Sequence, residues 1–172
     1  MQIIIEGPDG SGKTTLINKL AQVAGWKIIP GNGPEKYPGE MMERIQEYLK
    51  WARYNQGYSG SAKIYDRHPC VSHPIYSRFN GTSVVCQQAA DKVYELKHVA
   101  VYCRPPDSTR LIHPQEKEHD VGLHLAAITN HHADICSMYE EWALKRAHLI
   151  HRYWDKDSTS RTISAIIALA GE

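Results

Sequence analysis

Residues 7–14 read Gly-Pro-Asp-Gly-Ser-Gly-Lys-Thr, which has the form G-x-x-x-x-G-K-T of a phosphate-binding loop. The β-branched run at 2–6 precedes this loop, and residues 15–20 follow it with apolar side chains at helical spacing. A strand, a turn and a helix in this order place the turn at a helix N-terminus, where free N–H groups and the helix dipole attract an anion. The sequence therefore predicts a site for a nucleoside triphosphate.

Each part of the loop has an expected role. The three glycines let the backbone approach the phosphates closely. Lys13 can reach the β- and γ-phosphates, and the Thr14 hydroxyl can bind Mg²⁺. We therefore expect ATP and Mg²⁺ as cofactors. The residues expected to hold the nucleotide are Gly7, Asp9, Gly10, Ser11, Gly12, Lys13, Thr14 and Thr15.

The composition excludes several classes of protein. The chain has 172 residues, which fits one domain, and its formal net charge of +1 gives no overall field for nucleic acid or a membrane surface. No stretch approaches the ~20 apolar residues of a membrane span, and the first strand begins at residue 2, without room for a signal peptide. The cysteines form no C-x-x-C pair, which fits reduced thiols. We expect a cytoplasmic protein with no membrane partner.

Strand and helix patterns alternate along the chain. Further strands are predicted at 26–29, 62–65, 98–103 and 149–153, and helices at about 40–54, 121–145 and from 158 onward. Strands separated by helices form right-handed βαβ units, which give a parallel sheet with helices on both faces. We expect one α/β domain over 1–172, a three-layer sandwich around a central parallel sheet of about five strands, with a short lid at about 104–120.

Charged residues follow two more of the predicted strands. Asp66 and Arg67 follow the third strand, and Arg104 follows the fourth. The carboxyl ends of parallel strands lie at one edge of a sheet, where ligands bind, so these residues should meet the loop. Phosphoryl transfer needs in-line positioning and cations around the moving group. Lys13, Arg67 and an arginine of the lid would provide those cations.

Residues 5–15 resemble the phosphate loop of thymidylate kinases and related deoxynucleotide kinases, which share an E-G-x-D-G-x-G-K-T-T signature. Asp66-Arg67-His68 is similar to that family's D-R-[YH] motif. Ser72 and Tyr76 are similar to a serine and a tyrosine downstream of it, offset by one residue. The resemblance implies a P-loop kinase fold and a homodimer. It also implies that Asp9 contacts the sugar hydroxyl of the acceptor and that Arg67 bridges the donor and acceptor phosphates.

The chain departs from the family pattern at three places. The loop has no arginine, which shifts that role to Arg104 or Arg110 of the lid. The R-E-P-G element that helps to bind the acceptor monophosphate is replaced by Pro-Gly-Asn-Gly at 30–33. The F-x-x-x-R element that reads thymine is absent. Trp51, Arg53 and Tyr54 lie in the corresponding helix, either as substitutes or as ordinary packing and surface residues.

These observations favour an ATP-dependent kinase that phosphorylates a deoxynucleoside monophosphate, dTMP-like, to the diphosphate. The alternative is a kinase for the hydroxyl of 5-hydroxymethyluracil in DNA, as in phage DNA base modification, in which Asp66 or Asp9 would act as the base. A third hypothesis is a nucleotide-dependent switch, although no N-K-x-D element occurs. The expected catalytic residues are Lys13, Arg67, Asp66, Asp9 and Arg104, and the expected Mg²⁺ ligands are Thr14 and Asp66.

Two further patterns have both a functional and an ordinary interpretation. Histidines gather before and within the predicted helix at 121–145, together with Cys136, but their spacing does not match a zinc motif, and surface histidines are the more common case. His119 and Asp120 stand where the lid would rejoin that helix and could contact phosphates. Scattered basic and aromatic residues could bind nucleic acid or form a solvated surface. The histidines in question are His113, His119, His124, His131 and His132.

Overall fold

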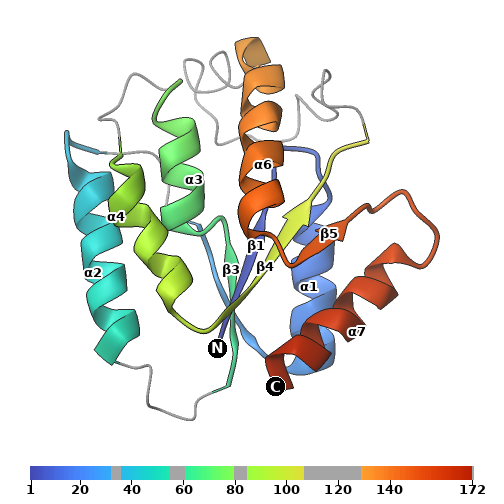
Figure 1. Ribbon diagram of the computed structural model, residues 1–172. Coiled ribbons are helices and arrows are strands. Elements are labelled where there is room, and N and C mark those ends of the chain that lie inside the picture. The colour runs from blue at the N-terminus through green and yellow to red at the C-terminus, as the bar shows by residue number, and fades with distance from the viewer. Residues whose placement is uncertain (32–35, 55–60, 80–84, 107–128, 172) are drawn as a thin grey trace.

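The computed structural model describes residues 1–31, 36–54, 61–79, 85–106 and 129–171 (Figure 1). These residues form a five-stranded parallel sheet with the order β2-β3-β1-β4-β5. The strands are β1 (Gln2–Glu6), β2 (Lys27–Ile29), β3 (Lys63–Asp66), β4 (His98–Cys103) and β5 (Leu149–His151). The described helices are α1 (Lys13–Ala24), α2 (Glu40–Tyr54), α3 (Pro69–Tyr76), α4 (Gln87–Asp91), the 3₁₀ turn η1 (Lys92–Glu95), α6 (His132–Arg146) and α7 (Ser158–Gly171).

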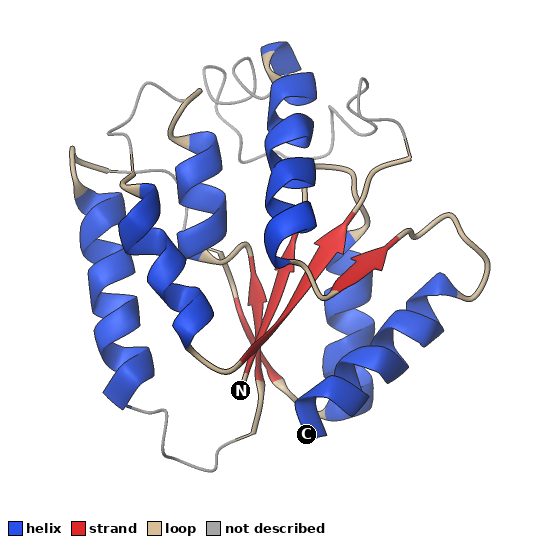
Figure 2. Ribbon diagram, in the orientation of Figure 1, coloured by secondary structure: helices blue, strands red, loops and turns tan. Residues whose placement is uncertain are grey.

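The helices cover both faces of the sheet and make three layers (Figure 2). One core cluster joins Ile4 and Tyr102 to α2, α3, α4, η1 and α6. The other joins Ile3, Ile5 and the alternate residues of β3 and β4 to α1 and α7. Because β1 is central and buried on both faces, its sequence is a continuous isoleucine run rather than an alternation of apolar and polar residues. The predicted α/β sandwich is confirmed.

Most element boundaries lie within a few residues of those that the sequence predicted. The bounds of α2 and β4 are as predicted, and β2, β3 and α7 begin within one residue of expectation. The strand predicted at 149–153 ends at His151, and the helix predicted from 121 is described from His132, with residues 121–128 outside the described part. The predicted lid at 104–120 is described only to residue 106.

The short helix α3 was not predicted. It begins with Pro69 in its first turn, where a missing N–H costs nothing, and contains a second proline, Pro74. His68 caps it, because the His68 Nδ1 atom accepts a hydrogen bond from the Cys70 backbone N–H at 3.1 Å. Burial lowers the His68 pKa to about 3, so the ring is neutral and free to accept. The histidine of the Asp66-Arg67-His68 motif is therefore a helix cap.

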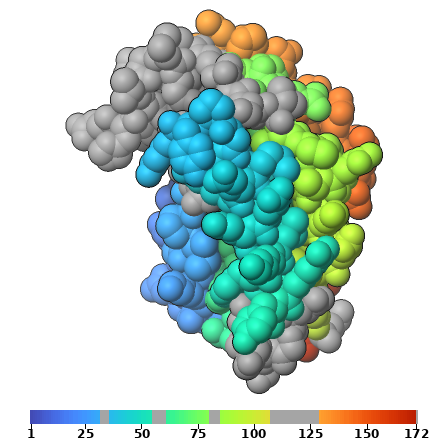
Figure 3. Space-filling model, turned by 90° about the vertical axis from the view of Figure 1, so that its left-hand side faces the viewer, coloured from blue at the N-terminus to red at the C-terminus, as the bar shows by residue number. Residues whose placement is uncertain are grey.

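The strands all point the same way, so their carboxyl ends form one edge, the upper edge in Figure 2. That edge carries the phosphate loop after β1, Asp66 as the last residue of β3 with Arg67 directly after it, and Arg104 after β4. The helix α2 runs down the side of the molecule that faces the viewer in Figure 3, between α1 and the α4–η1 segment. Across the described ranges, every helix is too short or too polar to span a bilayer.

Candidate active site

The phosphate loop is tightly enclosed by the strand ends beside it. Gly7 has φ 148°, and a Cβ there would lie 2.3 Å from the Cys103 carbonyl oxygen at the end of β4. Gly12 has φ 80°, and a Cβ there would lie 2.8 Å from the Tyr153 ring. Both the backbone conformation and the space available therefore require glycine at these two positions. The glycines of the G-x-x-x-x-G-K-T motif are therefore what allow the loop to take this shape.

Lys13 lies inside the curve of this loop. Its Nζ atom donates hydrogen bonds to the carbonyl oxygens of Gly7 at 2.7 Å and Pro8 at 2.6 Å, and it lies 3.4 Å from Ser11 Oγ. Burial, together with the positive charge of Arg67, lowers the Lys13 pKa to about 8. A phosphate in the loop would counter both effects, because an anion favours the charged ammonium. The Lys13 ammonium therefore lies where its charge would stabilise a bound phosphate.

The start of α1 presents free backbone donors to the same space. Gly12 is its N-cap in a left-handed conformation and offers no side-chain cap, and the first turn carries no acidic residue. Thr14 and Thr15 are exposed in that turn. An uncapped helix N-terminus beside a lysine is an anion site by both hydrogen bonding and dipole. This geometry agrees with the role predicted for the loop.

Arg67 faces the loop from the end of β3. Its Nη2 atom lies 2.7 Å from Asp9 Oδ1, and its Nη1 atom donates to the Tyr76 hydroxyl of α3 at 2.7 Å. The guanidinium carbon also lies 5.0 Å from the centre of the Tyr76 ring. Arg67 has φ 60°, a conformation that non-glycine residues adopt rarely and at some cost. Two side chains therefore hold one strained arginine against the phosphate loop.

Glu6, at the end of β1, forms hydrogen bonds with three other parts of the fold near Arg67. The carboxylate is fully buried and accepts hydrogen bonds from the His68 backbone N–H, from Ser72 Oγ at 2.9 Å and from the Tyr139 hydroxyl at 3.1 Å. These donors come from the turn after β3, from α3 and from α6. Burial raises the Glu6 pKa to about 7, although the charge of Arg67 and the Ser72 hydrogen bond oppose the shift. Tyr139 could not have been found from sequence, because nothing local ties it to a residue 133 positions away.

Asp66 and Arg104 lie at the same edge as the loop. Asp66 is in register with Ile5 of β1, and its charge is one of those that raise the Lys13 pKa. Arg104 continues from β4, but its Nε atom binds Glu140 of α6 at 2.8 Å, and its side chain is 44% exposed. The structure therefore brings Asp9, Lys13, Asp66 and Arg67 together, with Arg104 turned toward α6.

Thr14 and Asp66, the predicted Mg²⁺ ligands, suit that ion by their chemistry. A hydroxyl and a carboxylate supply the hard oxygen atoms that Mg²⁺ prefers, and the ion also takes oxygen atoms from phosphates and water. The negative charge of Asp66 lies near enough to Lys13 to favour its charged form, and Lys13 is the group expected to contact the phosphates. In the described part of the chain, no group of three or more histidine, cysteine or acidic side chains could hold a metal by itself.

Several predicted positions lie elsewhere. Trp51 packs over Lys63 Nζ at 3.9 Å, and Arg53 pairs with Glu95 at 3.2 Å. Lys63 is the first residue of β3, at the edge opposite the loop, so Trp51 lies away from the phosphate loop. His131 contacts Asp134 at 3.4 Å, and His132 contacts Cys136 at 3.5 Å. The positions predicted at Arg110, His113, His119, Asp120 and His124 lie outside the described residues.

An aromatic pair beside the loop was missed by sequence reasoning. Tyr153 and Trp154 follow β5, and their rings meet edge to face with centres 5.4 Å apart. Both remain partly exposed, at 38% and 41%, although Tyr153 touches Gly12. The adjacent aromatic residues could have indicated a surface that binds a flat ring, but only the fold shows that Tyr153 adjoins the phosphate loop.

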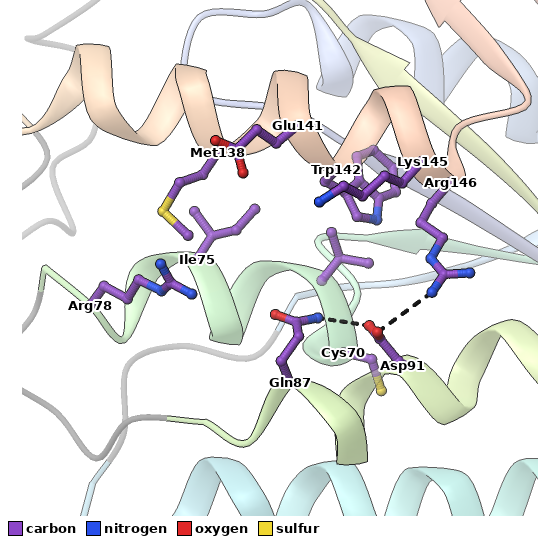
Figure 4. Close-up of a pocket in the computed structure, with 11 residues that line it drawn as sticks. Cys70, Ile75, Arg78, Gln87, Asp91, Met138, Glu141, Trp142, Lys145 and Arg146 are labelled. Carbon is purple, nitrogen blue, oxygen red and sulfur yellow. Dashed lines mark hydrogen bonds and ion pairs between the residues drawn. The ribbon is translucent and has the colours of Figure 1, made fainter.

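A separate groove of about 230 Å³ lies between α3, α4 and α6 (Figure 4). Asp91 in this groove binds Gln87 at 2.7 Å and Arg146 at 3.5 Å. The groove contains none of the predicted site residues. It is lined by Cys70, Val71, Ile75, Arg78, Gln87, Asp91, Met138, Glu141, Trp142, Lys145 and Arg146.

Sequence comparisons match parts of the chain. The family model described as ATPase family associated with various cellular activities (AAA) matches residues 3–71, which include the loop and Arg67. Protein SAV from Sulfolobus acidocaldarius is 45% identical over 56 residues, which are 31% of this chain and 7% of that protein. The chain thus spans a small fraction of this curated relative's length. The residues that the family model matches include the nucleotide-binding part of the sheet.

Structural comparisons cover the whole chain. YorR protein from Bacillus subtilis, in complex with phosphorylated GDP, has a TM-score of 0.66 and 19% identity over 99% of this chain and 98% of that one. Deoxyadenosine kinase from M. mycoides with bound dATP has a TM-score of 0.52 and 17% identity over 100% of both chains. Thymidylate kinase from Ehrlichia chaffeensis has a TM-score of 0.50 and 15% identity over 100% of this chain and 98% of that one. The chain therefore has the fold of the P-loop kinases.

Proposed function

We propose that this chain is an ATP- and Mg²⁺-dependent phosphotransferase that acts on a deoxynucleoside monophosphate, dTMP-like, and forms the diphosphate. The observation that carries the proposal is the placement of Arg67 against Asp9 of the phosphate loop, at 2.7 Å. A loop with Lys13 alone would serve any nucleotide-binding protein. Transfer between two phosphates also needs a cation that neutralises charge on the moving phosphoryl group. Arg67, held at the loop from the end of β3, would supply it.

The donor triphosphate would occupy the loop and the N-terminus of α1. Lys13 and the backbone N–H groups of α1 would hold the β- and γ-phosphates, with Thr14 and Asp66 holding Mg²⁺, which would neutralise charge on the transferring group. Tyr153 lies next to Gly12, and the partly exposed rings of Tyr153 and Trp154 would offer apolar surface to the donor base. The donor base would therefore lie beside the turn that follows β5.

Arg67 and Asp9 would act on the acceptor side. Arg67 would screen the transferring phosphoryl group, and Asp9 would position the acceptor through its sugar hydroxyl. Because the oxygen of a monophosphate is already a nucleophile at neutral pH, this reaction needs no strong general base. Arg104 is a further cation at the same edge, and release from Glu140 would free it to reach the phosphates.

The solved structures support a kinase of this general kind. The deoxyadenosine kinase and the thymidylate kinase named above share the fold over nearly the whole chain. The names of these two kinases differ in the acceptor, a nucleoside in one and a nucleotide in the other. The acceptor class is therefore the part of the proposal that needs a direct test.

A second candidate is phosphorylation of the 5-hydroxymethyluracil hydroxyl in DNA. It is favoured by the turn after β2, where a Cβ on Gly31 would lie 2.7 Å from the Asp66 carbonyl oxygen and 3.0 Å from Arg67 Cβ. Gly31 thus packs its backbone on the strand end that carries Arg67. A monophosphate clamp at this position would require a longer side chain. For an alcohol acceptor, Asp66 or Asp9 would be the base.

An acceptor screen with γ-labelled ATP separates these candidates. The acceptors are the common and 5-substituted deoxynucleoside monophosphates, the corresponding deoxynucleosides, and DNA with and without 5-hydroxymethyluracil. We expect label on a monophosphate, and its loss in Lys13→Ala. Label on modified DNA alone would support the second candidate, with activity that falls steeply with salt. Label released only as inorganic phosphate in every arm would instead indicate a nucleotide-dependent switch.

A further inference from the structure

Glu6 is too deeply buried to touch a substrate, yet it contacts the parts of the site that hold Arg67. Its side chain has 0% exposure, and it is the last residue of β1, directly before Gly7. We propose that Glu6 is a positioning residue that sets the place of the Arg67 guanidinium by tying the turn after Arg67, α3 and α6 to the phosphate loop. This inference rests on the proposed function, in which Arg67 acts on the transferring phosphoryl group.

The first contact is to the backbone that follows Arg67. Glu6 Oε1 accepts a hydrogen bond from the His68 N–H, which belongs to the peptide group directly after Arg67. Arg67 has φ 60°, so the chain gains from any contact that stabilises this conformation. A backbone N–H can only donate, so a carboxylate is well matched to it. Glu6 therefore stabilises the strained turn from which Arg67 projects.

The second contact is to the helix that holds the Arg67 side chain. Ser72 Oγ lies 3.1 Å and 2.9 Å from the two carboxylate oxygens of Glu6. Ser72 and Tyr76 are four residues apart on α3 and therefore lie on the same side of that helix. Tyr76 accepts the hydrogen bond from Arg67 Nη1 at 2.7 Å. Fixing α3 through Ser72 therefore also fixes the hydroxyl that orients the guanidinium.

The third contact brings in α6. The Tyr139 hydroxyl donates to Glu6 Oε2 at 3.1 Å, and the Tyr139 ring meets the Tyr76 ring edge to face with centres 6.3 Å apart. The next residue on α6, Glu140, binds Arg104 at 2.8 Å. One buried carboxylate thus connects the loop to the two helices that contact Arg67 and Arg104. Loss of that carboxylate would loosen Arg67 without removing any group that binds ATP.

The test is a double-mutant cycle between Glu6 and Arg67. Glutamine can still accept from His68 but replaces one carboxyl oxygen with an NH₂ group that cannot accept from Ser72 or Tyr139, whereas alanine loses every contact. We expect kcat to fall about 10-fold in Glu6→Gln and about 100-fold in Glu6→Ala, while KM for ATP changes less than about threefold. In an Arg67→Ala background, Glu6→Gln should change kcat less than about twofold, because its effect runs through the arginine. The proposal would be overturned if Glu6→Gln lowered kcat by the same factor in the Arg67→Ala background as in the wild type. It would also be overturned if Glu6→Gln changed only KM.

A matched control removes a different tyrosine hydroxyl that contacts α6, that of the partly buried Tyr94. Tyr94→Phe deletes the hydroxyl that accepts from Trp142 Nε1 at 2.6 Å, whereas Tyr139→Phe deletes the hydroxyl that reaches Glu6. We expect a lower kcat only in Tyr139→Phe. Equal kcat losses in the two variants would mean a general packing effect and would overturn the inference. Should Glu6→Ala not fold, Glu6→Gln and Tyr139→Phe still decide the matter.

A readout on the free protein separates this inference from the proposed function. The Arg67 guanidinium N–H signal in a ¹⁵N NMR spectrum can be assigned by its loss in Arg67→Lys. We expect this signal to be sharp in the wild type and in Tyr94→Phe, and broadened or shifted in Tyr139→Phe and Glu6→Gln. An unchanged signal in both of the latter variants would overturn the positioning role. A wild type that transfers no phosphoryl group would overturn only the proposed function.

Discussion

Arg67 Nη2 lies 2.7 Å from Asp9 Oδ1, and this ion pair joins the end of β3 to the phosphate loop across 58 positions of the sequence. Both side chains are largely shielded from solvent, at 22% and 14% exposure. Such a pair is screened less by water and salt than a surface pair. The arginine is therefore oriented before any phosphate arrives, which lowers the cost of organising the site.

Arg67→Lys should remove this orientation while keeping the charge. Lysine is a single point charge and cannot span Asp9 and Tyr76 as the forked guanidinium does. We expect kcat to fall about 100-fold, with KM for ATP changed less than about threefold. Initial rates with the preferred acceptor measure both constants. Arg53→Lys changes an exposed arginine that pairs with Glu95 and should retain wild-type rates, so equal losses in the two variants would contradict the prediction.

Gly12→Ala should abolish nucleotide binding. A Cβ at this position would meet the Tyr153 ring at 2.8 Å, and φ is 80°. We expect the affinity for ATP, measured by calorimetry, to fall at least about 100-fold, because the loop must rearrange to relieve both problems.

Gly25→Ala is the matched control for the backbone effect alone. Gly25 has φ 68°, but a Cβ there would meet nothing within 4 Å. We expect this variant to lose about 1 kcal/mol of stability and to bind ATP normally. The difference in ATP affinity between Gly12→Ala and Gly25→Ala isolates the steric contribution of Tyr153. Normal ATP binding by Gly12→Ala would contradict the prediction, because it would show that ATP binding does not need the present shape of the loop.

The sequence was sufficient for those parts of the site whose signals are local. The isoleucine run of β1, the glycines of the loop and the apolar spacing of α1 follow one another directly, and each element favours the next. The convergence of Asp66 and Arg67 on the loop was also predictable, since parallel strands end at one edge. The family resemblance singled out both Asp9 and Arg67, but it did not imply that the two side chains pair with each other.

The parts that could not be predicted depend on tertiary contacts. Helix α3 contains two prolines in eight residues, and its cap is a histidine held neutral by burial. In the sequence, Tyr139 looks like any aromatic residue on the buried side of a helix. Only the fold shows that its hydroxyl contacts Glu6. Tyr153 follows an edge strand, and its relation to Gly12 arises only when β5 joins the sheet. No local pattern distinguishes these residues from core or surface positions.

Tyr153→Ala should weaken the binding of the donor nucleotide. A base stacked on an aromatic ring gains about 1–3 kcal/mol, so we expect KM for ATP to rise about 10-fold with a small change in kcat. Tyr153→Phe keeps the ring and should stay near the wild type. Steady-state kinetics with varied ATP provide the measurement. Tyr54→Ala, which removes a tyrosine that is 77% exposed at the end of α2, serves as the control, and a normal KM in Tyr153→Ala would place the donor base elsewhere.

Glu6 should make the stability of the protein fall as pH rises toward neutrality. Burial raises its pKa in the folded chain from 4.5 to about 7 against the opposing charges of Arg67 and Lys13. Below pH 4.5 the carboxyl is protonated in both the folded and the unfolded chain. Between about pH 4.5 and 7 the unfolded chain releases this proton more readily, so the contribution of Glu6 to stability is lost as pH rises through the folded pKa.

Urea unfolding at several values between pH 5 and pH 8 measures this contribution. The glutamine of Glu6→Gln does not titrate. The free energy of unfolding of this variant, minus that of the wild type, should therefore increase by up to roughly 1.4 kcal/mol per pH unit up to pH 7, and should be constant at higher pH. Glu47→Gln, at an exposed position of α2, controls for the loss of one carboxylate. Parallel curves for the wild type and Glu6→Gln across the whole range would mean that Glu6 is ionised throughout. The hydrogen bonds from His68, Ser72 and Tyr139 would then outweigh the cost of burying its charge.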